Sequence, residues 1–171
     1  ISYNAAISAF EKGVQWQQAC AIFAQMRQQL LGPDVISCNA AMSALEKGEQ
    51  WLKALEMLSQ MQQWQLDPDL YSYNCAFNAC EKGDQWQQAL MMLLEMRQKH
   101  LAPGAMAYAG TIIACEHSEQ WQRALGLMLE MRQQCLEPSF VTYNAAGIAC
   151  EKTGAGDMAW RYSWRRVSGV W

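Results

Sequence analysis

The sequence has few histidines and lacks the cysteine spacing of a metal site. Its two histidines are His100 and His117, and none of its seven cysteines belongs to a C-x-x-C pair. Zinc-ligand spacing is therefore absent, and we expect no metal or other cofactor. Three cysteines share one position with two apolar residues at intervals of 35 residues, which predicts buried free thiols and a reducing compartment. The members of this column are Phe10, Leu45, Cys80, Cys115 and Cys150.

Long apolar runs and an excess of positive charge are also missing. The longest uncharged apolar run, from Ala89 to Leu94, is far shorter than the roughly 20 residues that span a bilayer, so no membrane span is expected. The formal net charge of −3 gives no global attraction to nucleic acid or to an anionic membrane. Any contact with a polyanion must therefore be local.

Patterns typical of enzymes are missing as well. The sequence has no glycine-rich phosphate loop and no nucleophile constellation. An H-x-E triplet at His117 lacks the C-x-x-C that would complete a zinc deaminase signature. The recurring glutamates occupy one point of successive repeats and form no acid-base pair, so we expect that the protein is not an enzyme. These glutamates are Glu11, Glu46, Glu81, Glu116 and Glu151.

Proline is scarce, and its placement shows an internal repeat. The four prolines, Pro33, Pro68, Pro103 and Pro138, follow one another at intervals of 35 residues. Tyr-Asn pairs, Glu-Lys pairs and tryptophans return with the same period. Such a period is typical of a solenoid, in which each unit buries its apolar face by stacking on its neighbours. The chain begins at Ile1 within a repeat and without an initiator methionine, which predicts a fragment.

Each repeat contains two amphipathic stretches, which predict an antiparallel helix pair. In the first stretch, apolar residues recur in steps of four and three, as at Tyr73, Phe77 and Cys80. Pro-Asp or Pro-Ser, with Ser or Thr three residues further on, suits the helix start. The second stretch begins at a tryptophan and continues with alanine, leucine and methionine, whose methionines are expected in the core. Glycines after Glu-Lys suit a left-handed helix end, at Gly13, Gly48 and Gly83.

The predicted repeats form one all-α solenoid domain. They span residues 1–34, with the first residue missing, 35–69, 70–104 and 105–139. Residues 140–171 are expected to form a degenerate fifth repeat and a C-terminal cap over the last apolar face. The tail mixes arginines with aromatic residues, which also suits contact with RNA bases or a partner. These tail residues are Trp160, Arg161, Tyr162, Trp164, Arg165, Arg166 and Trp171.

A hairpin of 35 residues with this order of signals resembles the pentatricopeptide repeat family over about residues 1–160. The tetratricopeptide repeat differs in its period of about 34 residues and in its tryptophan placement. The tryptophan that opens each second helix departs from the usual pentatricopeptide pattern. The resemblance implies a right-handed α-solenoid that binds single-stranded RNA in a plastid or mitochondrion, with one base per repeat.

The resemblance also implies which side chains recognise bases, namely the fifth and the last residue of each motif. Two Asn-Asp pairs resemble the uridine-preferring combination, and a carboxamide offers both a donor and an acceptor to a base edge. The third pair lacks its carboxylate at Gly104, and the fourth consists of Ala109 with Ser139. The predicted base-reading residues are Asn4 with Asp34, Asn39 with Asp69, Asn74, and Asn144, which lacks a partner.

Two further columns follow from the resemblance. The second residue of each motif is expected to stack on a base, and the apolar or aromatic surface at each of these positions suits that role. A lysine near the end of the first helix is expected to face phosphate, although a glutamate precedes each one and a solvated helix end is the alternative. The stacking residues are Ile1, Ile36, Tyr71, Met106 and Val141, and the lysines are Lys12, Lys47, Lys82 and Lys152, with His117 in the remaining repeat.

Two functions compatible with this pattern remain open. The first is a single-stranded RNA-binding protein with a preference for uridine, acting in organellar RNA stability, processing or translation. The second is a structural adaptor or assembly subunit of a large organellar complex, which the acidic balance and the altered fourth repeat favour. Exposed apolar residues outside the stacking column would favour the adaptor, and Trp64 is the candidate.

Overall fold

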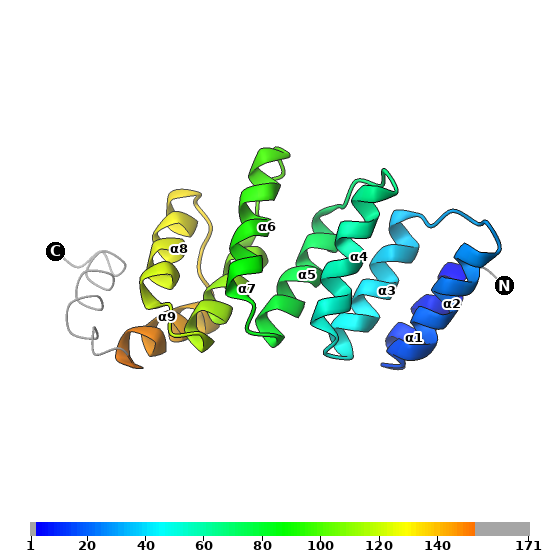
Figure 1. Ribbon diagram of the computed structural model, residues 1–171. Helices are drawn as coiled ribbons and strands as arrows, with labels where there is room; N and C mark the ends of the chain where they lie inside the picture. The colour runs from blue at the N-terminus through cyan, green and yellow to red at the C-terminus, as the bar shows by residue number, and fades with distance from the viewer. Residues whose placement is uncertain (1–2, 153–171) are drawn as a thin grey trace. The chain divides into compact units, whose positions relative to one another are not determined.

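The computed structural model describes residues 3–152, and all regular structure within that range is helical (Figure 1). The chain divides into two compact units, Ile1–Gly83 and Asp84–Trp171, called here the N-terminal unit and the C-terminal unit. The N-terminal unit contains α1 (Tyr3–Lys12), α2 (Trp16–Gln28), α3 (Val35–Lys47), α4 (Trp51–Gln63) and α5 (Leu70–Lys82). The C-terminal unit contains α6 (Trp86–Gln98), α7 (Ala105–His117), α8 (Trp121–Gln133) and α9 (Phe140–Lys152).

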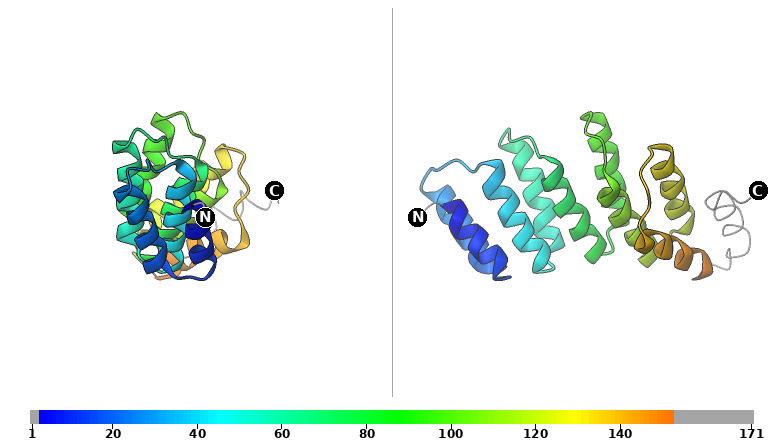
Figure 2. Two further views of the ribbon diagram at one scale, coloured as in Figure 1. Left: turned by 90° about the vertical axis from the view of Figure 1, so that its right-hand side faces the viewer. Right: turned by 180° about the vertical axis from the view of Figure 1, so that it is seen from behind.

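The first and second helices of the repeats pack in the order that a stack of helical hairpins requires. In the N-terminal unit, α3 packs against α1 and α5, while α2 packs against α1 and α3, and α4 packs against α3 and α5, in a second row (Figure 2). In the C-terminal unit, α7 packs against α6, α8 and α9. The predicted all-α helical-repeat solenoid is therefore confirmed as the fold class.

The buried side chains are those that the periodic pattern predicts. Tyr73, Phe77 and Cys80 of α5 are completely buried, as are Ala89, Leu93 and Met96 of α6 to within two per cent. The methionine column therefore belongs to the core. Burial raises the pKa of Cys80 to about 12 and that of Cys115 to about 11, so both thiols stay protonated at neutral pH.

Aspartate caps start two first helices of the N-terminal unit, as predicted. The side chain of Asp34 accepts a hydrogen bond from the backbone N–H of Ser37 at 2.7 Å, and Asp69 does so from Ser72 at 2.9 Å. In each case the serine hydroxyl accepts the backbone N–H of the aspartate, which completes a capping box. These caps fix where α3 and α5 begin.

The predicted left-handed glycines are wrong by one residue. Gly48 and Gly83 have φ angles of −85° and −97°, whereas the following residues, Glu49 and Asp84, have φ angles of 57° and 55°. Glycine is needed here for close packing. A Cβ on Gly48 would lie 2.2 Å from Cδ1 of Trp16, and one on Gly83 would lie 2.5 Å from Cγ of Trp51. Each tryptophan therefore lies against the backbone of the following first helix.

The prediction that Trp64 is an exposed apolar residue is also wrong. Its ring is half-buried, with its centroid 6.1 Å from that of Phe23, and the guanidinium carbon of Arg27 lies 4.6 Å from the ring centroid. The equivalent arginine of the C-terminal unit, Arg97, donates to the Tyr108 hydroxyl, but Cys38 offers no hydroxyl at that position. Trp64 therefore supplies the contact surface for Arg27.

Within residues 3–152, no helix is long and apolar enough to cross a membrane, and no three potential ligand side chains gather around a possible metal position. Several of the predictions lie outside the described residues. These are Ile1, the side chains of Cys150 and Lys152, the interruption of the fifth repeat, and the C-terminal cap with its arginines and aromatic residues.

Candidate nucleic-acid interface

The structure brings both predicted Asn-Asp pairs together in the N-terminal unit. Asn4 lies on α1 and donates through Nδ2 to Asp34, with distances of 3.0 Å to Oδ2 and 3.3 Å to Oδ1. Asn39 lies on α3 and donates in the same way to Asp69, with distances of 3.1 Å to Oδ1 and 3.3 Å to Oδ2. The repeat therefore produces the same polar pair twice within this unit.

The two aspartates are held in the ionised form. Burial alone would raise the pKa of Asp34, but hydrogen bonds from Ser37 and Asn4 outweigh it and hold the pKa below its usual value. The same balance lowers the pKa of Asp69, where Ser72 and Asn39 are the donors. An ionised carboxylate only accepts hydrogen bonds, so it turns the amide nitrogen of its asparagine toward itself.

The second pair is also fixed from its other end. The Ser72 hydroxyl donates to Oδ1 of Asn39 at 2.6 Å, so both polar atoms of this carboxamide have a partner. One N–H of Nδ2 and a lone pair of Oδ1 remain for a base edge. From the sequence, Ser72 was expected only to cap the helix. Its second contact, with Asn39 of the preceding repeat, was not predicted, although its place three residues after Asp69 puts it beside the predicted pair.

The remaining predicted readers lack this arrangement. Asn74 belongs to the N-terminal unit, while Gly104, which caps α7 without a side chain, belongs to the C-terminal unit. Within the C-terminal unit, Ser139 forms a hydrogen bond of 2.9 Å with the Thr142 hydroxyl, and Ala109 has no polar side-chain atom. Asn144 is exposed on α9.

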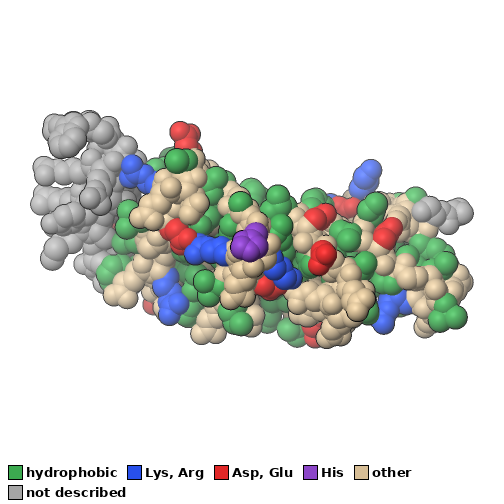
Figure 3. Space-filling view, turned by 90° about the horizontal axis from the view of Figure 1, so that it is seen from above, with side chains coloured by type: hydrophobic (Ala, Val, Ile, Leu, Met, Phe, Trp, Pro, Cys, Tyr) green, Lys and Arg blue, Asp and Glu red, His purple; other side chains and the backbone are tan. Residues whose placement is uncertain are grey.

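The predicted stacking residues project from the second position of each first helix. Ile36 and Tyr71 of the N-terminal unit are 65% and 51% exposed, and Met106 and Val141 of the C-terminal unit are 55% and 60% exposed. Their side chains therefore offer apolar surface to solvent at the position where base stacking was predicted. In both units, hydrophobic side chains on the face shown in Figure 3 lie among polar and charged ones.

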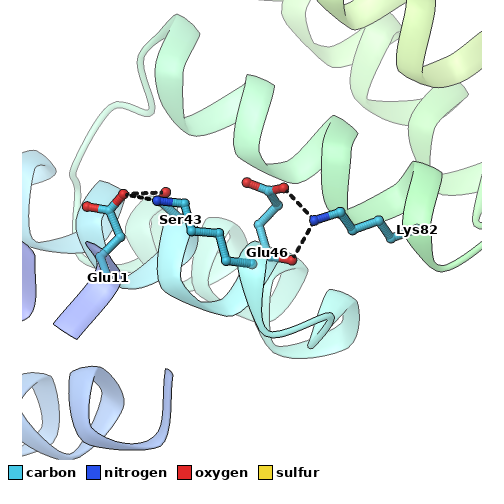
Figure 4. A network of polar contacts seen from close by, with 5 residues as sticks. Glu11, Ser43, Glu46 and Lys82 are labelled. Atoms are coloured by element: carbon cyan, nitrogen blue, oxygen red, sulfur yellow. Dashed lines mark hydrogen bonds and ion pairs between the residues drawn. The ribbon is translucent and has the colours of Figure 1, made fainter. Parts of the chain in front are cut away.

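Two of the predicted phosphate-facing lysines are occupied by ion pairs. Nζ of Lys47 lies 2.8 Å from Oε1 of Glu11, and Nζ of Lys82 lies 2.8 Å from Oε1 of Glu46 (Figure 4). Lys82 also donates to the backbone carbonyl of Glu46 at 3.1 Å. The glutamates were predicted only to weaken the local positive field, but each binds the lysine of the following repeat.

The first of these glutamates has a second hydrogen-bond partner. The Ser43 hydroxyl donates to Oε1 of Glu11 at 2.9 Å. Burial alone would raise the pKa of Glu11, but Lys47 and Ser43 outweigh it and lower the pKa, while the hydrogen bond to Glu11 raises the pKa of Lys47. Both charges therefore persist at neutral pH.

The equivalent position of the C-terminal unit holds a histidine between carboxylates. Nδ1 of His117 lies 2.6 Å from Oδ1 of Asp84, and Nε2 lies 3.5 Å from Oε2 of Glu116. Lys12 is exposed at the end of α1. Among the described residues, the column predicted to face phosphate thus combines two paired lysines, a histidine beside carboxylates and an exposed lysine.

Comparison with protein-family models identifies repeats of one kind along much of the chain. A model of the PPR repeat family matches residues 33–82, and a model of the PPR repeat matches residues 1–29 and 71–101. PPR stands for pentatricopeptide repeat. No curated protein matches the chain by sequence.

Solved structures with the same fold include two such proteins. The pentatricopeptide repeat protein PPR10 from maize is similar with a TM-score of 0.80 and 24% identity over 98% of this chain, which spans 24% of the maize chain. PPR10 in complex with an 18-nt psaJ RNA element is similar with a TM-score of 0.72 and 25% identity over 92% of this chain and 23% of that one. The PPR domain of Arabidopsis thaliana protein-only RNase P 1 in complex with tRNA has a TM-score of 0.82 and 13% identity over 96% of this chain and 89% of that one.

Proposed function

Because the chain belongs to the pentatricopeptide repeat family, we propose that it binds single-stranded RNA and that its N-terminal unit prefers uridine. The observation that carries this proposal is the repeated Asn-Asp geometry at Asn4 with Asp34 and Asn39 with Asp69. The similar structures of PPR10 with an RNA element and of an RNase P domain with tRNA support RNA as the ligand.

Recognition would combine two contacts for each base. Exposed apolar surface at Ile36 and Tyr71 lies where a base face can stack, and each stacked base contributes about 1–3 kcal/mol without regard to its identity. Uracil presents one N–H donor between two carbonyl acceptors. A carboxamide with one free N–H and one free carbonyl lone pair complements that edge, and the ionised aspartate fixes which end of the amide faces the base.

The C-terminal unit would hold bases without distinguishing them. Met106 and Val141 offer exposed apolar surface, but Ala109 supplies no donor or acceptor to a base edge. Stacking tolerates any base because each base has a π face. We therefore propose that the base preference of the chain comes from the N-terminal unit.

The test is binding of the chain to oligo-uridine and oligo-adenosine of equal length, beside an Asn4→Ala/Asn39→Ala variant. The wild-type chain is expected to prefer uridine, and the variant to lose about 1–3 kcal/mol of discrimination for each asparagine, by analogy with paired contacts to base edges. An Asn144→Ala variant is the matched control and should keep the preference. Equal affinity of the wild-type chain for both oligonucleotides would contradict the proposed preference.

A second candidate function, a protein-binding adaptor, is favoured by one observation. Leu94 of α6 and Leu129 of α8 occupy the same repeat position and are 56% and 45% exposed, and Met91 is 64% exposed. Exposed apolar side chains outside the stacking column suit a protein partner. If the full-length protein acts as an adaptor, its assembly should survive ribonuclease and be lost in a Leu94→Gln/Leu129→Gln variant, as measured by native size-exclusion chromatography.

We also propose an organellar location, in a plastid or a mitochondrion, with a role in RNA stability, processing or translation. This rests on the family to which the chain belongs. A fluorescent fusion of the full-length protein that remains outside both organelles would contradict it.

A further inference from the structure

We propose that Glu11 and Glu46 compete with the phosphates of the RNA backbone for two lysines. Each glutamate pairs with a lysine that would otherwise contact phosphate. This inference rests on the proposed function, because it concerns the affinity of the same surface for RNA and the dependence of that affinity on salt. The two glutamates would thus set the affinity of the N-terminal unit for RNA and the salt dependence of that affinity.

The two ion pairs have the same geometry one repeat apart. Each joins a glutamate to the lysine that lies 36 residues later, with an Nζ to Oε1 distance of 2.8 Å. Figure 4 shows the two glutamates and their partners along the ends of the first helices. The glutamate side chains are 17% and 15% exposed, whereas both lysine side chains are 39% exposed. The glutamate side chains are therefore less exposed than the lysine side chains that they pair with.

Additional hydrogen bonds hold both pairs in place. Ser43 donates to the carboxylate of Glu11 at 2.9 Å, and the backbone carbonyl of Glu46 accepts from Lys82 at 3.1 Å. Partly exposed ion pairs stabilise a fold only weakly. Their repetition at the position predicted to face phosphate is thus more simply explained by an effect on an anionic ligand than by stability.

The consequence for binding follows from counterion release. A lysine that contacts phosphate replaces a condensed cation on the nucleic acid, which makes affinity fall with salt. Lys47 and Lys82 can form such a contact only by giving up, or sharing, a carboxylate that already neutralises them. RNA binding by the N-terminal unit is then dominated by stacking and base recognition, with a shallow dependence on salt.

The test uses a Glu11→Gln/Glu46→Gln variant of the chain. Glutamine keeps an oxygen that accepts from Ser43 or lysine but removes the charge, so the fold should be retained. The matched control is Glu49→Gln/Glu56→Gln, which changes the net charge equally at two exposed glutamates of the same unit. Binding is measured across a salt series with two probes, oligo-uridine and inorganic polyphosphate, and circular dichroism checks the fold.

The variant is expected to bind both probes more tightly than the control does. Its slope of log affinity against log salt for oligo-uridine should be steeper by up to about 1.4, because each single-strand phosphate contact contributes about 0.7. Slopes and affinities equal to those of the control would overturn the inference. A gain for polyphosphate, with no oligo-uridine binding by any of the proteins, would show that the glutamates withhold the lysines from phosphate groups but would contradict the proposed function.

A lysine variant tests the same inference without touching the glutamates. Lys47→Ala/Lys82→Ala should lower the oligo-uridine affinity and the salt slope less in the wild-type chain than in the Glu11→Gln/Glu46→Gln background, because only in that background are the lysines free to contact phosphate. The same substitutions made in the Glu11→Gln/Glu46→Gln background should abolish its gain. A loss of affinity and a change of slope that are equal in the two backgrounds would overturn the inference.

Discussion

The two units of the chain share a set of buried positions but differ at the surface that the repeat would present to RNA. Tyr73 and Tyr108 occupy the same repeat position, and both are buried. Immediately beside them, Asn74 in the N-terminal unit is replaced by Ala109 in the C-terminal unit. The fold depends on the buried tyrosine position and not on the neighbouring asparagine position. The predicted base-reading side chain can therefore be lost while the helices persist.

The units also differ in what joins their helices. In the N-terminal unit, Trp16 lies between the backbone at Gly48 and the ammonium group of Lys53, which is 4.3 Å from the ring centroid. In the C-terminal unit, Arg123 lies 4.5 Å from the ring centroid of Trp86, but Ser118 stands where the other unit has glycine. A glycine at which the ring lies against the backbone is therefore a feature of the N-terminal unit.

The largest expected effect comes from breaking that contact. Gly48→Ala places a Cβ within 2.2 Å of the Trp16 ring, and we expect the free energy of unfolding to fall by about 1–3 kcal/mol, as overpacking usually costs. The measurement is chemical denaturation. The control is Gly126→Ala in α8, where a Cβ meets nothing within 4 Å, and it should stabilise the chain by about 0.5–1 kcal/mol. Equal effects of the two substitutions would contradict the proposed tight contact.

Restoring the missing pair should make the C-terminal unit resemble the N-terminal unit. In an Ala109→Asn/Ser139→Asp variant, the asparagine and aspartate occupy the positions of Asn39 and Asp69. We expect a gain of about 1–2 kcal/mol in oligo-uridine binding over oligo-adenosine, near the lower end of the range for paired base contacts. Fluorescence anisotropy measures it. Ala109→Asn alone, which lacks the orienting carboxylate, should gain less, and an equal gain would contradict the role given to the aspartate.

A smaller effect is expected from a hydrogen-bonded contact within the C-terminal unit. The buried Tyr108 hydroxyl accepts from Arg97 at 3.0 Å and donates to Glu130 at 3.2 Å, while Arg97 also pairs with Glu130. Tyr108→Phe should lower the free energy of unfolding by about 0.5–1.5 kcal/mol. Tyr3→Phe removes a more exposed hydrogen bond to Gln29 and should cost less. Thermal melts that rank the two in the opposite order would contradict this comparison.

The smallest expected effect appears only in acid. The folded-state pKa values of Asp34 and Asp69 are lowered, so their contribution to stability is present above the usual aspartate pKa of about 3.9 and is lost as the pH falls through the folded-state values. In an Asp34→Asn/Asp69→Asn variant, the introduced carboxamides would still cap both helices. The variant should therefore show a flatter loss of stability between about pH 5 and about pH 2. Denaturation curves at each pH measure it, and parallel curves for the two proteins would contradict the assignment.

Much of the fold was predictable because it depends on local order and period. The step of four and three that buries Tyr73, Phe77 and Cys80 is present in the sequence, and the Pro-Asp signal placed the caps at Asp34 and Asp69 correctly. The pairing of Asn39 with Asp69 followed from the family resemblance.

Other features depend on contacts between repeats, which periodicity does not specify. Glu11 and Lys47 lie 36 residues apart, and only the stacking of α1 on α3 brings them together. The conformation of Gly48 was mispredicted because a helix-end glycine usually marks a left-handed turn, while here the ring of Trp16 requires it. Trp64 is half-buried because its ring contacts Phe23 and Arg27 of the preceding repeat, which the sequence pattern does not specify.

The most direct test of the difference between the units is an NMR titration of the chain with oligo-uridine, which follows the side-chain amide signals of its asparagines. If base recognition belongs to the N-terminal unit, the signals of Asn4 and Asn39 should shift strongly and that of Asn144 little, and oligo-adenosine should produce smaller shifts at Asn4 and Asn39. Shifts of equal size at all three asparagines, or the same shifts with both oligonucleotides, would contradict it.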